Sequence, residues 1–192
     1  NPAEQNGLKI VLDRQTLAAG SIAEIRDQAA AGNFSAGNGR ITQENIVPAY
    51  LDRVRHDIAI ATPLKIVIDA SNGATSEIAP QLFQALGCDV IRLNCEVDGR
   101  FPGHPPDTSN EENLAMLAQE VVDVEADFGV AFDGDGDRLA VVTPSGKIIR
   151  SDVLLMLYAQ DILSRNPGAD VVFDIKCSRQ LSTLITALGG RP

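Results

Sequence analysis

The hydrophobic positions of the chain follow two spacings that alternate along most of its length. Short runs of apolar residues are typical of buried strands, and they occupy residues 8–12, 64–69, 89–93, 127–132 and 171–175. Longer stretches with apolar residues three or four apart predict helices over residues 20–32, 46–60, 78–86, 111–122, 152–164 and 179–188. Ser21 is expected to cap the first of these helices. Because strand and helix alternate, the sequence predicts an α/β fold with mixed, mostly parallel sheets flanked by helices.

Two parts of this pattern predict how strands pair. Between residues 64 and 93 a strand, a turn, a helix ended by Gly87 and a second strand follow one another. This order is typical of a βαβ unit, whose two strands lie parallel with a right-handed crossover. Residues 139–143 and 147–149 are separated by Pro-Ser-Gly, which predicts an antiparallel hairpin.

Composition and charge narrow the classes of function. With 44% hydrophobic and 22% charged residues, the chain has an ordinary globular composition. A net charge of −10 argues against non-specific binding to nucleic acid or anionic lipid, so we expect no nucleic-acid partner and no membrane. Three cysteines without CxxC spacing favour reduced thiols in a cytoplasmic protein. We see no signal peptide and no membrane helix, and expect an internal piece of a longer protein.

The run Asp-Gly-Asp-Gly-Asp-Arg follows the strand predicted at residues 127–132 directly. In parallel α/β sheets, ligands gather beyond the carboxyl ends of the strands. Carboxylates at alternate positions, separated by flexible glycines, can surround one cation, and oxygen ligands suit Mg²⁺ or Ca²⁺. The candidate metal ligands are therefore Asp133, Asp135 and Asp137. Arg138 follows them and adds a permanent charge for a phosphate group.

Other interpretations of this run stay open on the residues alone. It could be an exposed acidic turn, or a cation-binding module without enzymatic activity. It could also belong to a phosphatase of the haloacid-dehalogenase type, in which Asp133 would be the nucleophile. An EF-hand loop is excluded, because Arg138 and Pro144 stand where that loop needs glycine and usually glutamate.

Several co-linear segments resemble the α-D-phosphohexomutases, specifically their bacterial phosphomannomutase/phosphoglucomutase branch. The resemblance is carried by residues 1–2 and 6–9, Asp69–Ala74, Phe101–Asp107, Glu112–Leu114, Ala131–Arg138 and Asp174–Arg179. Thr108 departs from the family, where proline is common after the aspartate. The resemblance implies repeated phosphohexomutase-type domains, with the end of domain 1 at residues 1–45, domain 2 at 46–147 and the start of domain 3 at 148–192.

The resemblance also implies an activity. Members of this family interconvert hexose 1-phosphates and hexose 6-phosphates, of mannose or glucose, through hexose 1,6-bisphosphate, so these sugars are the expected partners. A serine before Asn1 would carry the phosphoryl group, and the 192-residue piece alone is expected to be inactive. His104, in the Pro-rich segment, is interpreted as an exposed or loop-bracing residue rather than a ligand.

Residue roles follow from the same resemblance. The cofactor would be Mg²⁺, held by Asp133, Asp135 and Asp137. Arg138 and Lys176 would contact the phosphosugar. Lys9 would be the catalytic general acid/base, although a lysine in an apolar strand is otherwise often an edge residue with its head in water.

Overall fold

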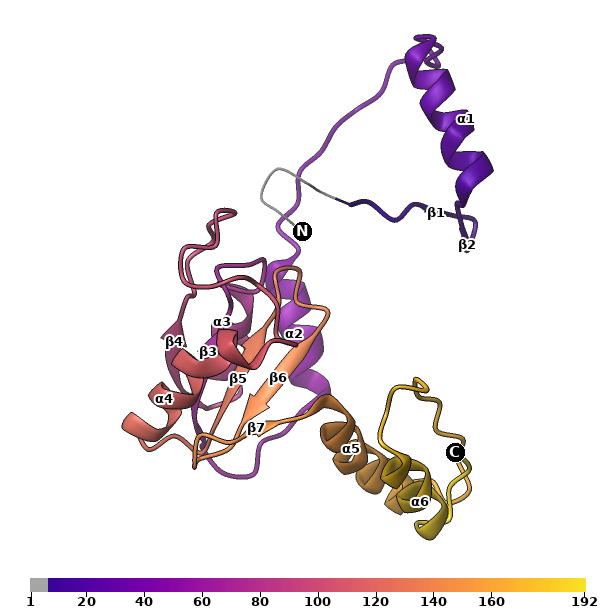
Figure 1. Ribbon diagram of the computed structural model, residues 1–192. Coiled ribbons are helices and arrows are strands. Elements are labelled where there is room, and N and C mark those ends of the chain that lie inside the picture. The colour runs from indigo at the N-terminus through magenta and orange to yellow at the C-terminus, as the bar shows by residue number, and fades with distance from the viewer. Residues whose placement is uncertain (1–6) are drawn as a thin grey trace. The chain divides into compact units, whose positions relative to one another are not determined.

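The computed structural model describes residues 7–192, and it divides the chain into two units. The first runs to Ile46 and the second from Val47 to Pro192 (Figure 1). The three-domain division expected at residues 1–45, 46–147 and 148–192 stays a prediction.

The first unit has little regular structure besides one helix. Strands β1 (Val11–Leu12) and β2 (Gln15–Thr16) form a short antiparallel hairpin, and α1 (Ala19–Ala30) follows. None of the residues of α1 is buried. The expected cap at Ser21 is wrong, because the helix already begins at Ala19 and Ser21 lies inside its first turn.

The second unit contains a five-stranded mixed sheet with the strand order β4-β3-β5-β6-β7. The strands are β3 (Lys65–Asp69), β4 (Asp89–Leu93), β5 (Phe128–Phe132), β6 (Leu139–Val142) and β7 (Ile148–Ile149). Strand β3 lies between β4 and β5 and is parallel to both, whereas β6 is antiparallel to β5 and β7. The predicted βαβ unit, the hairpin and the mixed α/β class are therefore confirmed.

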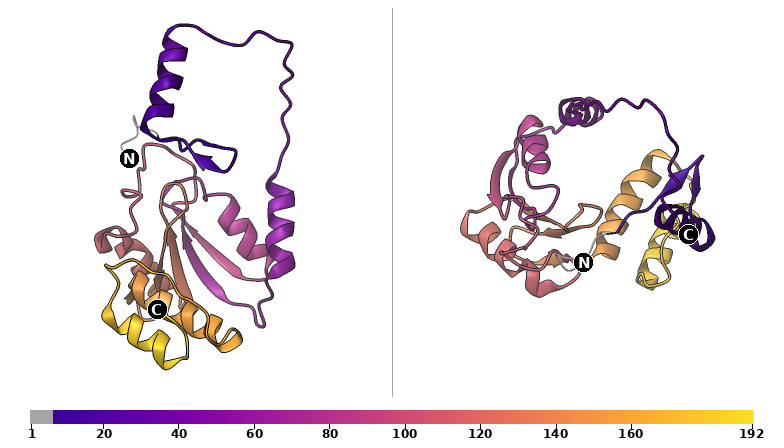
Figure 2. Two further views of the ribbon diagram at one scale, coloured as in Figure 1. Left: turned by 90° about the vertical axis from the view of Figure 1, so that its right-hand side faces the viewer. Right: turned by 90° about the horizontal axis from the view of Figure 1, so that it is seen from above.

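Helices cover both faces of this sheet. In chain order, the helices of the second unit are α2 (Val47–Asp57), α3 (Ile78–Ala85), the 3₁₀ helix η1 (Glu111–Leu114), α4 (Ala115–Asp123), α5 (Ser151–Arg165) and α6 (Arg179–Ala187). Helix α4 packs on β3, β5 and β6, while α3 packs on β4 and α2 packs on α3. Figures 1 and 2 show α4 on one side of the sheet and α3 with α2 on the other. No helix among residues 7–192 combines the length and apolar character needed to cross a bilayer.

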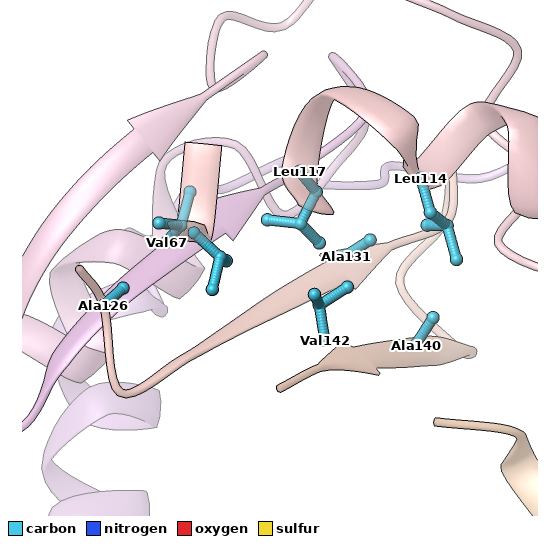
Figure 3. Close-up of a cluster of buried hydrophobic side chains, with 8 residues drawn as sticks. Val67, Leu114, Leu117, Ala126, Ala131, Ala140 and Val142 are labelled. Atoms are coloured by element: carbon cyan, nitrogen blue, oxygen red, sulfur yellow. The ribbon is translucent and has the colours of Figure 1, made fainter. Parts of the chain in front are cut away.

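Alternation along β3 produces the two cores of the sheet. Val67 points toward α4 and joins a buried cluster that includes Leu117 and Val142 (Figure 3). Ile66 and Ile68 point the other way and pack in a second cluster beneath α3. All five side chains are fully buried, and each contributes about 1.5–3 kcal/mol relative to an exposed position.

Helices α5 and α6 pack on each other around a third cluster, formed by Ala159, Leu163, Leu181 and Ile185. The strand expected at residues 171–175 is wrong, since the chain there is irregular and makes a single parallel bridge nearby, between Asp170 and Arg191. Val172 and Ile175 are 94% and 97% exposed. A strand needs backbone hydrogen bonds from a neighbour, and within residues 7–192 this segment finds them only around Arg191.

We predict that Gly129→Ala destabilises the sheet core. A Cβ atom at Gly129, in the middle of β5, would lie 2.5 Å from Val121 Cγ2 and 2.8 Å from Leu117 Cδ1. Because these buried side chains must shift, the free energy of unfolding should fall by about 1–3 kcal/mol in urea unfolding of the protein. Gly99→Ala is the matched control, since its Cβ would meet no atom within 4 Å. Equal unfolding midpoints for the two variants would contradict this account of the packing.

Candidate metal-binding and phosphate-binding site

Two buried carboxylates lie at one edge of the sheet. Asp69 is the last residue of β3, and Asp133 follows the last residue of β5. Because β3 and β5 are parallel and Asp69 pairs in register with Ala131, both side chains emerge at the carboxyl ends of the strands. Both are 0% exposed. A buried carboxylate is costly unless donors or cations surround it, so the local structure must supply them.

The acidic loop folds back on its own first residue. The backbone N–H of Arg138 donates to Asp133 Oδ1 at 3.0 Å, and the N–H of Gly136 donates to the Asp133 carbonyl at 3.1 Å. Gly136 has φ +73°, a conformation that glycine adopts at little cost. The alternating glycines predicted to make the loop flexible thus permit a tight turn around Asp133.

A second turn, after β3, holds the acidic loop from the side. Ser71 Oγ donates to the Phe132 carbonyl at 2.6 Å, and the N–H of Ala74 donates to the Gly134 carbonyl at 2.9 Å. A Cβ atom at Gly73 would lie 2.5 Å from the oxygen of Gly134. Only glycine therefore allows the two turns to approach this closely.

The three predicted metal ligands lie together. One carboxylate oxygen each from Asp133, Asp135 and Asp137 lies within 4.8 Å of the others, with Asp133 buried and the other two exposed. Burial raises the pKa of Asp133, and the charges of Asp135 and Asp137 raise it further, while the hydrogen bond and charge of Arg138 act in the opposite direction. The cluster therefore favours a bound cation, which would relieve both the burial cost and the repulsion.

These residues fit a hard divalent cation. Asp133 Oδ2 is buried and accepts no hydrogen bond of good geometry, although Arg138 Nη2 lies 2.7 Å away. That oxygen is thus available for coordination. Oxygens around Mg²⁺, with bonds of about 2.1 Å, lie roughly 3–4 Å apart, so small side-chain rotations bring the three carboxylates to that spacing. Among residues 7–192 no other set of three or more His, Cys, Asp or Glu side chains is so arranged.

Arg138 lies among three carboxylates while keeping much of its surface accessible. Its guanidinium contacts Asp133 at 2.7 Å, Asp137 at 3.4 Å and Asp107 at 3.6 Å, and its side chain is 58% exposed. Asp133 above all, and Asp137 to a smaller extent, raise the pKa of Arg138. Hydrogen bonds from Ser109 chiefly lower the pKa of Asp107, with a smaller contribution from Arg138. Arg138 is therefore a permanent cation next to the metal ligands, with open surface for a phosphate group.

The other predicted site residues lie elsewhere in the chain. Lys176 follows the irregular segment after α5, is 83% exposed and pairs with Asp174 at 3.4 Å. It lines an open cavity of about 520 Å³ together with Ser109, Arg150 and Asp152. Lys9 is an exposed residue of the first unit, shortly before β1. The roles of both lysines stay predictions.

Sequence reasoning missed the polar network at the end of β3. His104 Nε2 lies 2.9 Å from Asp69 Oδ2, and its side chain is 10% exposed, so His104 braces the loop rather than facing solvent. Asn94 Nδ2 donates to Asp69 Oδ1 at 3.1 Å. One signal could have found Asp69, because it ends a buried apolar strand just as Asp133 follows one. No local pattern could have indicated that His104, 35 residues away, contacts it.

The fold and the acidic loop together define an α/β domain with a carboxylate cluster and an adjacent arginine at the carboxyl end of a central strand. Residues 48–146 match the family model described as phosphoglucomutase/phosphomannomutase, alpha/beta/alpha domain II. The chain belongs to this family.

Individual relatives agree with this assignment. The chain is 52% identical over 192 residues to the phosphomannomutase/phosphoglucomutase of Pseudomonas aeruginosa, and 44% identical to the phosphoglucomutase of Neisseria gonorrhoeae. A solved structure of a phosphoglucomutase/phosphomannomutase family protein from Burkholderia thailandensis superposes with a TM-score of 0.91 at 41% identity, covering 100% of this chain and 42% of that one. The two alignments cover 100% and 99% of this chain, but the chain spans only 42% of the length of each of these enzymes.

We predict that Gly73→Ala weakens metal binding, because the added Cβ would push the carbonyl of Gly134 and displace the acidic loop. Residues that support metal ligands typically change affinity by roughly 10–100-fold, and we expect a loss in that range. Calorimetric titration with Mg²⁺ and paramagnetic resonance with Mn²⁺ measure it, with Gly99→Ala as the control. Metal affinity equal to that of the unmodified protein would refute the supporting role of the turn.

Proposed function

We propose that the chain is part of an enzyme that reversibly interconverts hexose 1-phosphates and hexose 6-phosphates, of mannose, glucose or both. The reaction would pass through hexose 1,6-bisphosphate, and the enzyme would act in the cytoplasm. The single observation that carries the proposal is the loop Asp133–Arg138 at the carboxyl end of β5, in a chain 52% identical over its whole length to a phosphomannomutase/phosphoglucomutase.

The acidic loop would hold Mg²⁺ through Asp133, Asp135 and Asp137, whose carboxylate oxygens already lie within 4.8 Å of one another. A bound Mg²⁺ supplies positive charge that stabilises the negative charge of a transferring phosphoryl group. The protein residues provide positioning, which together with charge neutralisation is most of what phosphoryl transfer requires.

Arg138 would bind phosphate oxygens with its exposed guanidinium, whose planar fork can donate two parallel hydrogen bonds. Lys176 would contribute a second cation to the phosphosugar. Lys9 would take the proton from the attacking sugar hydroxyl and return it to the leaving oxygen in the reverse direction. The phosphoryl group would be carried by a serine outside the 192 residues of this chain, in accordance with the shorter span of the chain relative to its relatives.

The first test asks which atom carries the phosphoryl group. The complete protein is incubated with radioactive hexose 1,6-bisphosphate, quenched, divided and treated with or without hydroxylamine. A mutase should carry hydroxylamine-resistant label on serine, while the haloacid-dehalogenase alternative requires a labile acyl phosphate on Asp133. Turnover of mannose 1-phosphate and glucose 1-phosphate should be lost in Asp135→Asn, because one ligand charge is removed.

The control for that loss is Asp57→Asn, since Asp57 is an exposed residue at the end of α2 that pairs with Arg53 on the same helix. It should retain full turnover. Labile label on the peptide that contains Asp133 would replace the mutase assignment with the phosphatase.

A further prediction concerns Lys9. In the complete enzyme, Lys9→Met should lower kcat roughly 10²–10⁴-fold and change KM much less, because a general acid/base acts chiefly in the transition state. Steady-state kinetics with glucose 1-phosphate measure both constants. Lys147→Met removes an exposed lysine from the β6–β7 turn and should leave both unchanged. A kcat within about twofold of the unmodified enzyme would reassign Lys9 to a structural role.

A further inference from the structure

The segment Phe101–Asp107, which we call the Pro-rich loop, is attached to the end of β3 by His104, whose side chain is largely shielded from solvent. The ring of His104 lies with Nε2 2.9 Å from Asp69 Oδ2 and Nδ1 2.8 Å from the carbonyl of Pro105. The side chains of His104 and Asp69 are 10% and 0% exposed. This contact joins the loop to the sheet from within the protein, where competition from water is small.

Both ring nitrogens of His104 face acceptors. A carbonyl can only accept, so Nδ1 carries a proton. Asp69 also acts as an acceptor, because its Oδ1 receives hydrogen bonds from the N–H of Ser71 at 2.9 Å and from Asn94 Nδ2 at 3.1 Å. Imidazole is more basic than a carboxylate, so the proton between the two groups resides on Nε2, which donates to Oδ2. With Nδ1 also protonated, the ring is an imidazolium. In agreement, the hydrogen bond to Asp69 raises the pKa of His104 while burial opposes it.

The hydrogen bond between His104 and Pro105 is the first of a series of contacts that ends at Arg138. The carbonyl of Pro105 that accepts from His104 also accepts the backbone N–H of Asp107 at 2.8 Å. The carboxylate of Asp107 then lies 3.6 Å from Arg138 Nη1. A continuous series of contacts therefore connects the end of β3 to the guanidinium of Arg138.

The loop also packs on the acidic loop itself. A Cβ atom placed on Gly134 would lie 3.4 Å from Pro106 Cβ and 3.8 Å from Phe101 Cζ, which is ordinary contact distance. Elsewhere in the Pro-rich loop, the N–H of Gly103 donates to Asn72 Oδ1 at 3.4 Å. Displacement of His104 would therefore move residues that touch the metal-binding loop.

Asp107 differs from the other two acidic partners of Arg138. Asp133 and Asp137 belong to the carboxylate cluster that would be shared with a cation. Asp107 does not, so it is the carboxylate that stays available to Arg138 when the metal site is filled. The position of Asp107 then decides in which direction the guanidinium is held.

We propose that His104 is a positioning residue: held by Asp69, it places the Pro-rich loop so that Asp107 orients Arg138 toward the phosphate of the substrate. The inference rests on the proposed function for the identity of that phosphate, and on the contacts above for the positioning. Asp107, His104 and Asp69 need not touch the substrate themselves.

The test is a double-mutant cycle in the complete protein. His104→Ala and Asp107→Ala should each raise KM for the hexose phosphate roughly threefold to fivefold, the size expected for one partly exposed ion pair, with a smaller change in kcat. Because both act through the same carboxylate, the double variant should raise KM no more than the larger single effect. Mg²⁺ affinity should change by less than about threefold. If the double variant raised KM by the product of the two single effects, the connection through Asp107 would be refuted.

Conservative variants separate positioning from general stability. The amide of His104→Gln can reach the Nε2 position and donate to Asp69, whereas that of His104→Asn lies near Nδ1 and can reach only the carbonyl of Pro105. We expect Gln, not Asn, to recover the KM of the unmodified enzyme. His56→Ala removes the other histidine, which is exposed near the end of α2, and should leave KM unchanged. If His104→Ala does not fold, the Gln, Asn and Asp107→Ala variants still decide the question.

Two further readouts keep the inference distinct from the proposed function. ¹⁵N chemical shifts of the His104 ring should show both nitrogens protonated at pH 7, and a neutral ring would contradict the donor arrangement. The affinity for inorganic phosphate, measured by calorimetry, should fall in His104→Asn by the same factor as 1/KM. If the unmodified protein shows no turnover, the proposed function fails while this phosphate measurement still tests the positioning. If turnover is normal but His104→Asn matches the unmodified protein in KM and phosphate affinity, the positioning inference fails alone.

Discussion

The burial of two carboxylates at the ends of adjacent parallel strands governs the rest of the site. Asp69 and Asp133 are both inaccessible to solvent, and an unpaired charge in that environment is strongly unfavourable. The charges of the two carboxylates are compensated in different ways. Donors from Ser71, Asn94 and His104 surround Asp69. Asp133 Oδ1 receives the backbone N–H of Arg138, while Oδ2 lies 2.7 Å from the Arg138 guanidinium without a hydrogen bond of good geometry. Of the two buried carboxylates, Asp133 is therefore the one with an oxygen available to a metal ion.

Most of the fold around the site could be predicted because each element of the sheet has a local signal. The apolar run of β3 and the glycine after α3 identify the βαβ unit without knowledge of its partners. One failure occurred where the outcome depends on contacts distant in sequence, and the other where two local signals for a helix start compete. Residues 171–175 have the composition of a strand, but their backbone finds no strand to pair with among the described residues. Ser21 is a suitable cap residue, but it does not cap the helix because the helix already begins at Ala19.

The same distinction applies to the site. Asp133, Asp135, Asp137 and Arg138 fall within six consecutive residues, so their spacing alone predicted that they lie together. The network of Asp69 with Asn94 and His104 joins residues 25 and 35 positions apart. The pairing of Asp107 with Arg138 likewise depends on how the Pro-rich loop returns to the sheet. Sequence reasoning could assign His104 to a loop, but the direction of its ring follows only from the tertiary structure.

The candidate metal ligands begin at the carboxyl end of a strand in the middle of the sheet. The acidic loop follows β5, whose neighbours β3 and β6 are buried by two separate apolar clusters, and the turn at Gly73 contacts it from the side. A cation site gains affinity when its ligands are held in place before binding, since less ordering then accompanies it. In the proposed function Arg138 needs the opposite property, because it would bind a phosphate and release it again. Its partly exposed side chain is accordingly held only by ion pairs, from Asp107 on one side and from the acidic loop on the other. In this proposal the sheet edge orders the metal ligands, while a loop braced by His104 sets the direction of the more exposed cation beside them.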